Sequence, residues 1–195
     1  MKATITSLIF LLLSLTVSSQ TYKYIGIEEG LSNQKIYKIQ KDARGYMWFL
    51  THVGIDQYNG KEIKHYKLRE GNRELDPLLN INWTFLDKTG TLLVTGKQGR
   101  IFRYDSGHDR FVQIYNMYNY WNKDYHAFVR YSYIDQEDNV WLCGKSAIHL
   151  FNIESGQKQQ ISNRLGNITC IEQINSEHFF IGTDKRIYLA KLENG

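Results

Sequence analysis

The segment 115–126 holds the side chains of this sequence that are best suited to binding a ligand. It contains five aromatic residues and three asparagines within twelve positions. Aromatic rings cover the apolar faces of sugars, while amides and hydroxyls form hydrogen bonds with sugar hydroxyl groups. We therefore predict an oligosaccharide site that includes Tyr118, Tyr120, Trp121 and Tyr125. A competing interpretation, favoured by how often aromatic residues serve cores, is that these rings pack against a neighbouring sheet.

Other chemistry finds little support in the sequence. The six histidines, at positions 52, 65, 108, 126, 149 and 178, have no metal-ligand spacing. The segment 90–98 resembles a phosphate-binding loop, but five residues separate its glycines where four are required, and Gln98 replaces the magnesium-binding hydroxyl residue. We expect no catalytic residues, no metal site and no cofactor. The net charge of +4 contains no block of like charges and gives no argument for nucleic acid binding.

The candidate binding segment lies between copies of a short repeat. The four copies are Asp42-x-x-Gly45-x-x-Trp48, Asp87-x-x-Gly90-x-x-Leu93, Asp135-x-x-Asp138-x-x-Trp141 and Ile174-x-x-Glu177-x-x-Phe180. Their last residues are 45, 48 and 39 positions apart. A period of this length with several short strands is typical of β-propeller blades. The four repeat anchors, Trp48, Leu93, Trp141 and Phe180, are therefore expected to be buried between blades.

Each repeat predicts a blade of four antiparallel strands, and the fold class is all-β. In the first repeat the strands are expected at 36–40, 47–50, 55–58 and 62–66, with a turn at 42–45 and an Asn59-Gly60 hairpin. We place the blades at about 31–68, 78–115, 126–162 and 166–195. The last blade lacks its outer strand, so we expect an incomplete ring, an open arc. The alternative is that residues 22–27 supply that strand and close a small four-bladed ring.

The N-terminal segment predicts export. Residues 3–17 form an apolar run after Lys2 that is too short to span a bilayer, and small residues precede Gln20. We interpret residues 1–19 as a signal peptide and residues 20–195 as the propeller, located in the periplasm. Cys143 and Cys170 lie in apolar strands and are expected to be small buried residues. Whether they form a disulfide is left open.

Three motifs of the first repeat resemble a known family. They are Gly30-Leu31-Ser32, then Gly45-Tyr46-Met47-Trp48, then Gly54-Ile55-Asp56-Gln57-Tyr58-Asn59-Gly60. Together they are similar to the opening repeat of the two-component regulator propeller family. The resemblance extends over residues 28–195, although the later copies depart from the pattern, for example where Leu93 replaces the tryptophan.

The resemblance implies a sensory, ligand-binding module from the N-terminal end of a two-component sensor of the Bacteroidetes hybrid histidine kinase type. It implies recognition of a glycan fragment, a parent protein anchored in the inner membrane and open to homodimer formation, and further blades and downstream signalling domains as partners. This chain itself is expected not to be an enzyme. Two alternatives stay open: an architectural propeller that relays a signal or dimerises without binding ligand, and a secreted propeller enzyme such as a lyase or glycosidase.

Overall fold

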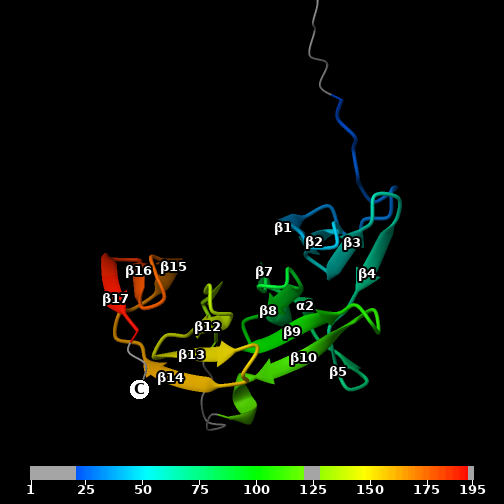
Figure 1. The fold of residues 1–195 in the computed structure, drawn as a ribbon. Helices are drawn as coiled ribbons and strands as arrows, with labels where there is room; N and C mark the ends of the chain where they lie inside the picture. The colour runs from blue at the N-terminus through cyan, green and yellow to red at the C-terminus, as the bar shows by residue number, and fades with distance from the viewer. Residues whose placement is uncertain (1–20, 121–127, 193–195) are drawn as a thin grey trace, which may run out of the picture.

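Four antiparallel sheets follow one another along an arc in the computed structural model, which describes residues 21–120 and 128–192 (Figure 1). The first three sheets have four strands each and the last has three, in the order of the chain. The predicted all-β propeller class is confirmed, and the sheets do not close into a ring. The predicted signal peptide, residues 1–19, lies outside the described residues.

The strands alternate with short turns throughout. The first sheet consists of β1 (Ile36–Lys41), β2 (Met47–Thr51), β3 (Ile55–Tyr58) and β4 (Ile63–Tyr66). The second consists of β7 (Trp83–Leu86), β8 (Leu92–Thr95), β9 (Arg100–Asp105) and β10 (Arg110–Asn116). The third consists of β11 (Tyr131–Ile134), β12 (Asn139–Cys143), β13 (Ala147–Asn152) and β14 (Lys158–Ser162), and the fourth of β15 (Ile168–Gln173), β16 (His178–Thr183) and β17 (Ile187–Lys191). The connections include β5 (Arg69–Glu70), β6 (Arg73–Glu74), α2 (Pro77–Asn80) and the 3₁₀ turn η1 (Met117–Asn119).

A buried aspartate shapes the first turn of the first sheet. Oδ1 of Asp42 accepts hydrogen bonds from the backbone N–H groups of Arg44, at 3.0 Å, and Tyr46, at 2.9 Å. Oδ2 of Asp42 accepts a hydrogen bond of 2.8 Å from the indole Nε1 of Trp48. Gly45 completes the turn with a φ of 90°, a conformation that suits glycine. One carboxylate therefore determines both the path of the turn and the position of the tryptophan.

The later sheets keep this arrangement and change the donor. Nε1 of Trp141 donates to Oδ2 of Asp135 at 2.9 Å. The side chain of Leu93 has no hydrogen-bond donor, and Nη2 of Arg103 lies 2.7 Å from Oδ2 of Asp87 in place of an indole. A buried carboxylate without a partner is costly, so the substitution of leucine for tryptophan is accompanied by a new cation.

The fourth sheet has Ile174 at the position of the turn aspartate. The next residue, Asn175, accepts the hydrogen bonds of the turn instead. Oδ1 of Asn175 accepts hydrogen bonds of 3.0 Å from the backbone N–H groups of Glu177 and His178. The repeat alignment contains no signal for this shift by one residue. An asparagine oxygen serves a turn as well as a carboxylate oxygen does, because both accept backbone hydrogen bonds.

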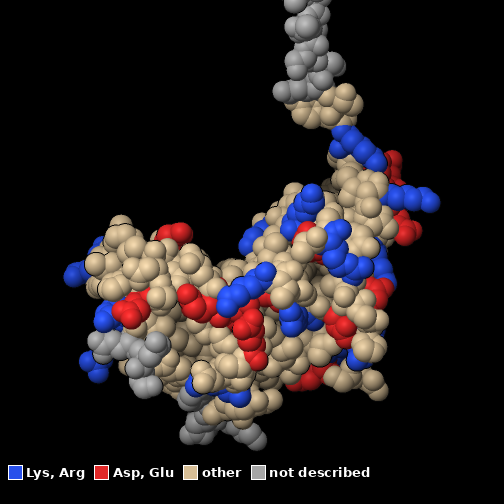
Figure 2. Space-filling model, viewed as in Figure 1, with Lys and Arg blue, Asp and Glu red and all other residues tan. Residues whose placement is uncertain are grey.

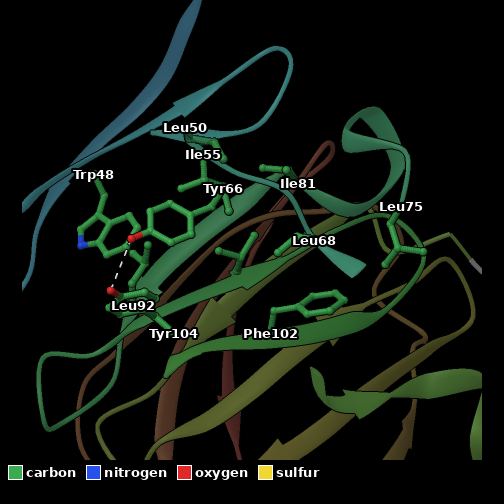
Figure 3. Packing of buried hydrophobic residues seen from close by; sticks show 11 residues of the cluster. Trp48, Leu50, Ile55, Tyr66, Leu68, Leu75, Ile81, Leu92, Phe102 and Tyr104 are labelled. Atoms are coloured by element: carbon green, nitrogen blue, oxygen red, sulfur yellow. Dashed lines mark hydrogen bonds between the residues drawn. The ribbon is translucent and has the colours of Figure 1, made fainter. Parts of the chain in front are cut away.

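Aromatic and aliphatic side chains fill each junction between neighbouring sheets. The ring centroid of Trp48 lies 4.7 Å from that of Tyr104 in the second sheet (Figure 3). It lies 5.7 Å from the ring centroid of Phe111 in the same sheet. Leu93 packs with residues of the third sheet, and the ring of Trp141 lies 4.8 Å from that of Phe179 in the fourth. The predicted burial of Trp48, Leu93 and Trp141 is confirmed.

The predicted burial of Phe180 is wrong. Phe180 pairs with Glu172 in the same register in which Trp48 pairs with Gln40, yet its side chain is 48 % exposed. In the first three sheets this face packs against the next sheet, and among the described residues no sheet follows the fourth. Phe179, on the opposite face, is the residue that packs against Trp141.

The expected open arc is confirmed, and the alternative of a closed four-bladed ring is wrong. In the described part of the chain, β17 pairs with β16 alone, and residues 21–26 form no strand. Figure 2 shows the molecule hollowed between the fourth sheet and the first. Because the described residues before β1 contribute no strand to β17, the two end sheets stay apart in this part of the chain.

Replacing Trp48 by alanine should lower the free energy of unfolding by about 3–5 kcal/mol, because a large buried side chain is lost at a sheet junction. Trp48→Phe keeps most of the ring and removes the donor to Asp42, for an expected loss of about 1–3 kcal/mol. Urea unfolding followed by circular dichroism measures both values.

Phe180→Ala is the matched control, since Phe180 occupies the same register position on an open face. Its expected effect is within about 0.5 kcal/mol, as for ordinary surface substitutions. An equal loss of stability in Trp48→Ala and Phe180→Ala would contradict the proposed difference between inner and end sheets.

Candidate functional site

The predicted binding segment begins directly after β10. Asn116 caps η1, and its Oδ1 accepts a hydrogen bond of 3.1 Å from the backbone N–H of Tyr118. Tyr118 is half-buried and packs against the hydrophobic cluster between the second and third sheets. Tyr120 points outward with 54 % of its surface exposed. Two neighbouring tyrosines of the prediction thus have different environments.

A stack of rings connects Tyr120 to the core. Its ring lies parallel to that of Tyr115, at 5.6 Å between centroids and an interplanar angle of 1°. The ring of Tyr115 in turn stacks on Phe151 of the third sheet at 4.7 Å. Nζ of Lys158, from β14, lies 4.1 Å from the centroid of Tyr120. Such a cation–π contact orders the ring and brings a positive charge to the exposed end of the stack.

Trp121 and Tyr125 lie outside the described residues. The four-residue sugar platform therefore stays a prediction. The environments of Tyr118 and Tyr115 agree with the competing interpretation, in which rings of this segment pack between sheets.

Two hollows lie near the end of β17. The larger, of about 830 Å³, is lined mainly by amide side chains and by Lys158 and Leu192. The smaller, of about 210 Å³, is apolar and lies between Ile161 and Leu165 on one side and Ala190 and Leu192 on the other. The larger is formed by residues of the third sheet together with Leu192, and the smaller lies at the junction of the third and fourth sheets, beside Trp141 and Phe179.

Two buried titratable groups, His149 and Cys143, are uncharged at neutral pH. Burial lowers the pKa of His149 to about 4, so its imidazole is neutral at pH 7. Burial raises the pKa of Cys143 to about 12, so its sulfur stays a thiol. In residues 21–120 and 128–192, no group of three or more His, Cys, Asp or Glu side chains is placed to hold a metal ion.

The prediction for the second cysteine is wrong. Cys170 is exposed, and both Cys143 and Cys170 are free thiols. Cys170 pairs with Gly182 and belongs to the same face of the fourth sheet as Phe180. Cys170 is exposed for the same reason as Phe180, because among the described residues no further sheet covers this face.

The Gly30-Leu31-Ser32 segment is tied to the middle of the first sheet. The backbone N–H and the Oγ of Ser32 both donate to Oδ2 of Asp56 at 2.8 Å. Asp56 is fully buried on β3, and its Oδ1 lies 2.8 Å from Nδ1 of His65. The carboxylate of Asp56 therefore holds this short segment against the first sheet.

Residues 30–52 match the two component regulator propeller family. The matched residues include the Ser32 segment and the Asp42–Trp48 turn, which are the two carboxylate-centred features of the first sheet. No curated protein matches the sequence at a significant level.

Solved structures of other proteins share the fold. The extracellular domain of BT4673 from B. thetaiotaomicron, described as a hybrid two component system, has 16% identity and a TM-score of 0.66, over 85% of this chain and 22% of that one. The extracellular domain of BT3049 from the same organism has 17% identity and a TM-score of 0.64, over 86% and 26%. YCF48 from Cyanidioschyzon merolae has 13% identity and a TM-score of 0.52, over 92% and 56%. The chain thus spans about a quarter of the two bacterial domains.

In the described part of the chain, no helix is long and apolar enough to cross a membrane.

The free energy of unfolding should fall as the pH is lowered from 6.5 towards about 4, because the unfolded chain protonates His149 in this range and the folded chain does not. Above pH 6.5 this contribution is complete and constant. His149→Gln stays neutral at every pH and should flatten the profile in this window. Urea unfolding at a series of pH values measures the slope, with His178→Gln as control. Equal slopes in wild type and His149→Gln would contradict the burial of this imidazole.

Proposed function

We propose that the chain is part of an extracytoplasmic sensory propeller in a two-component signalling protein. The observation that carries the proposal is the family repeat at 30–52 within an arc of sheets that resembles the extracellular domains of BT4673 and BT3049. We place the module on the periplasmic side of the inner membrane, in a parent protein whose downstream domains transmit the signal. The chain contributes ligand recognition or architecture, and we assign no catalytic step to it.

The open face of the fourth sheet supports a partner role for further propeller blades. Phe180, Ile187 and Leu189 are 48 %, 74 % and 64 % exposed on this face. In the other sheets the same face is covered by its neighbour. An exposed apolar sheet face of this kind marks an interaction surface. We propose that another blade of the parent protein packs here.

A glycan fragment is the proposed ligand. Tyr120 offers an exposed ring held in place by Tyr115 and Lys158, and the neighbouring hollow is lined by amide groups. This combination suits a sugar, which has apolar faces and many hydroxyl groups. The second candidate is an architectural module. The apolar face of the fourth sheet favours it, because a blade could transmit a signal by packing alone.

A glycan array followed by thermal-shift measurements on the purified chain distinguishes these two functions. A ligand of the folded state should raise the melting temperature in a concentration-dependent way. Tyr120→Ala should weaken that binding at least tenfold, since a stacking ring is lost. Tyr24→Ala, which removes an exposed tyrosine of the N-terminal segment, should leave binding unchanged. If no glycan shifts the melting temperature, the architectural function is the correct one.

A further inference from the structure

A surface groove of about 600 Å³ lies between the first and second sheets, away from the predicted aromatic site. It is lined by residues 64–67 around the end of β4, by residues 69–71 of the β5–β6 hairpin, and by residues 109–113 at the start of β10. Both flanking sheets have all four strands, unlike the sheet beside the hollows at Leu192. Its volume falls in the range of about 300–1,000 Å³ that is usual for ligand sites.

Two aromatic residues that line the groove, Tyr66 and Phe111, belong to a cluster of packed rings. The half-buried ring of Phe111 packs against the rings of Trp48 at 5.7 Å, Tyr66 at 5.7 Å and Tyr104 at 5.5 Å. The hydroxyls of Tyr66 and Tyr104 donate to Oδ1 of Asp109 at 2.5 and 2.7 Å. Burial, with a contribution from Tyr104, raises the pKa of Tyr66, so its hydroxyl remains a donor. Asp109 therefore joins the two sheets and holds these rings in place.

The acidic groups of the groove are already paired. Asp109 forms an ion pair with Lys64, and Glu70 lies 2.6 Å from Nη2 of Arg73 and 3.5 Å from Nη2 of Arg100. The ammonium of Lys67, which also lines the groove, lies 2.8 Å from Oε1 of Glu74. These contacts neutralise the negative charge that would repel an anion.

Two arginines that line the groove differ from the ion-paired residues above, because their guanidinium groups belong to no ion pair among the described residues. These arginines, Arg69 and Arg110, are both exposed. They come from opposite walls, Arg69 from β5 and Arg110 from β10. A guanidinium presents a planar set of donors that matches a carboxylate in a bidentate manner. The groove thus combines an apolar ring with two available anion-binding groups.

We propose that this groove binds an acidic oligosaccharide, with sugar carboxylates paired to Arg69 and Arg110 and an apolar sugar face against Phe111. Gln113 also lines the groove. This inference rests on the proposed role in glycan sensing. It adds the chemical class of the glycan and a second binding location on the chain. A carboxylate and a sulfate share the required chemistry, and the fork geometry favours the carboxylate.

Titration calorimetry with tetragalacturonate, maltotetraose and a sulfated heparin tetrasaccharide tests the proposal on the purified chain. We expect tetragalacturonate to bind, with an affinity that falls as salt is added. Maltotetraose should show no binding in this groove. The double variant Arg69→Gln/Arg110→Gln should weaken tetragalacturonate binding at least tenfold. Arg164→Gln/Arg186→Gln, which removes the same charge from exposed positions of the other end of the arc, should leave it unchanged.

The remaining outcomes each have one meaning. Equal loss in both double variants, or no loss in either, would overturn the groove assignment. Preference for the heparin fragment would overturn the carboxylate assignment, and binding of free galacturonate as tight as that of the tetramer would indicate an adventitious ion only. Binding of maltotetraose alone would overturn the acidic ligand class and leave the glycan-sensing function intact. If a broad glycan array also finds no ligand, both proposals fail.

Discussion

The buried carboxylate of Asp42 is the interaction on which the first sheet junction depends. It accepts hydrogen bonds from two backbone N–H groups of its own turn and from the indole of Trp48. Trp48 then packs against the second sheet, so the turn and the junction share one group. Because an unpaired buried polar group is costly, neither partner can change alone. Where the tryptophan is absent, an ion pair with Arg103 compensates the charge of the Asp87 carboxylate.

Hydrogen bonds between turns reinforce each junction. The backbone N–H of Ala43 donates to the carbonyl of Gly90 at 3.1 Å, and that of Lys88 donates to Oδ1 of Asp138 at 3.0 Å. The backbone N–H of Gln136 donates to Oε1 of Gln173 at 2.7 Å. In such an array each sheet interacts mainly with its neighbours, and stability is the sum of local terms. A ligand in the β4–β10 groove would therefore act on the first junction, where Asp109 already links the two sheets.

Local features of the fold could be predicted from the sequence, because turns and strand alternation depend on nearby residues. The Asp42 turn, the first-sheet strands and the burial of Trp48 and Trp141 belong to this class. The exposure of Phe180 and Cys170 depends on whether another sheet follows, so it is a consequence of the open arc that the repeat pattern around these residues does not record. The candidate site, too, could be predicted only where residues close together in the sequence define it. Tyr118 and Tyr120 were named from composition, whereas the groove is assembled from three segments whose proximity no sequence motif records.

Amide hydrogen exchange, resolved by residue with NMR, tests most directly whether the four sheets form an open arc held by neighbour contacts. The open arc predicts that residues 22–25 exchange at the rate of an unstructured chain while the central amides of β16 are strongly protected. Protection of residues 22–25 to the level of β16, together with protection of every amide along β17, would contradict it. That result would mean that the N-terminal segment pairs with the last sheet and closes the ring.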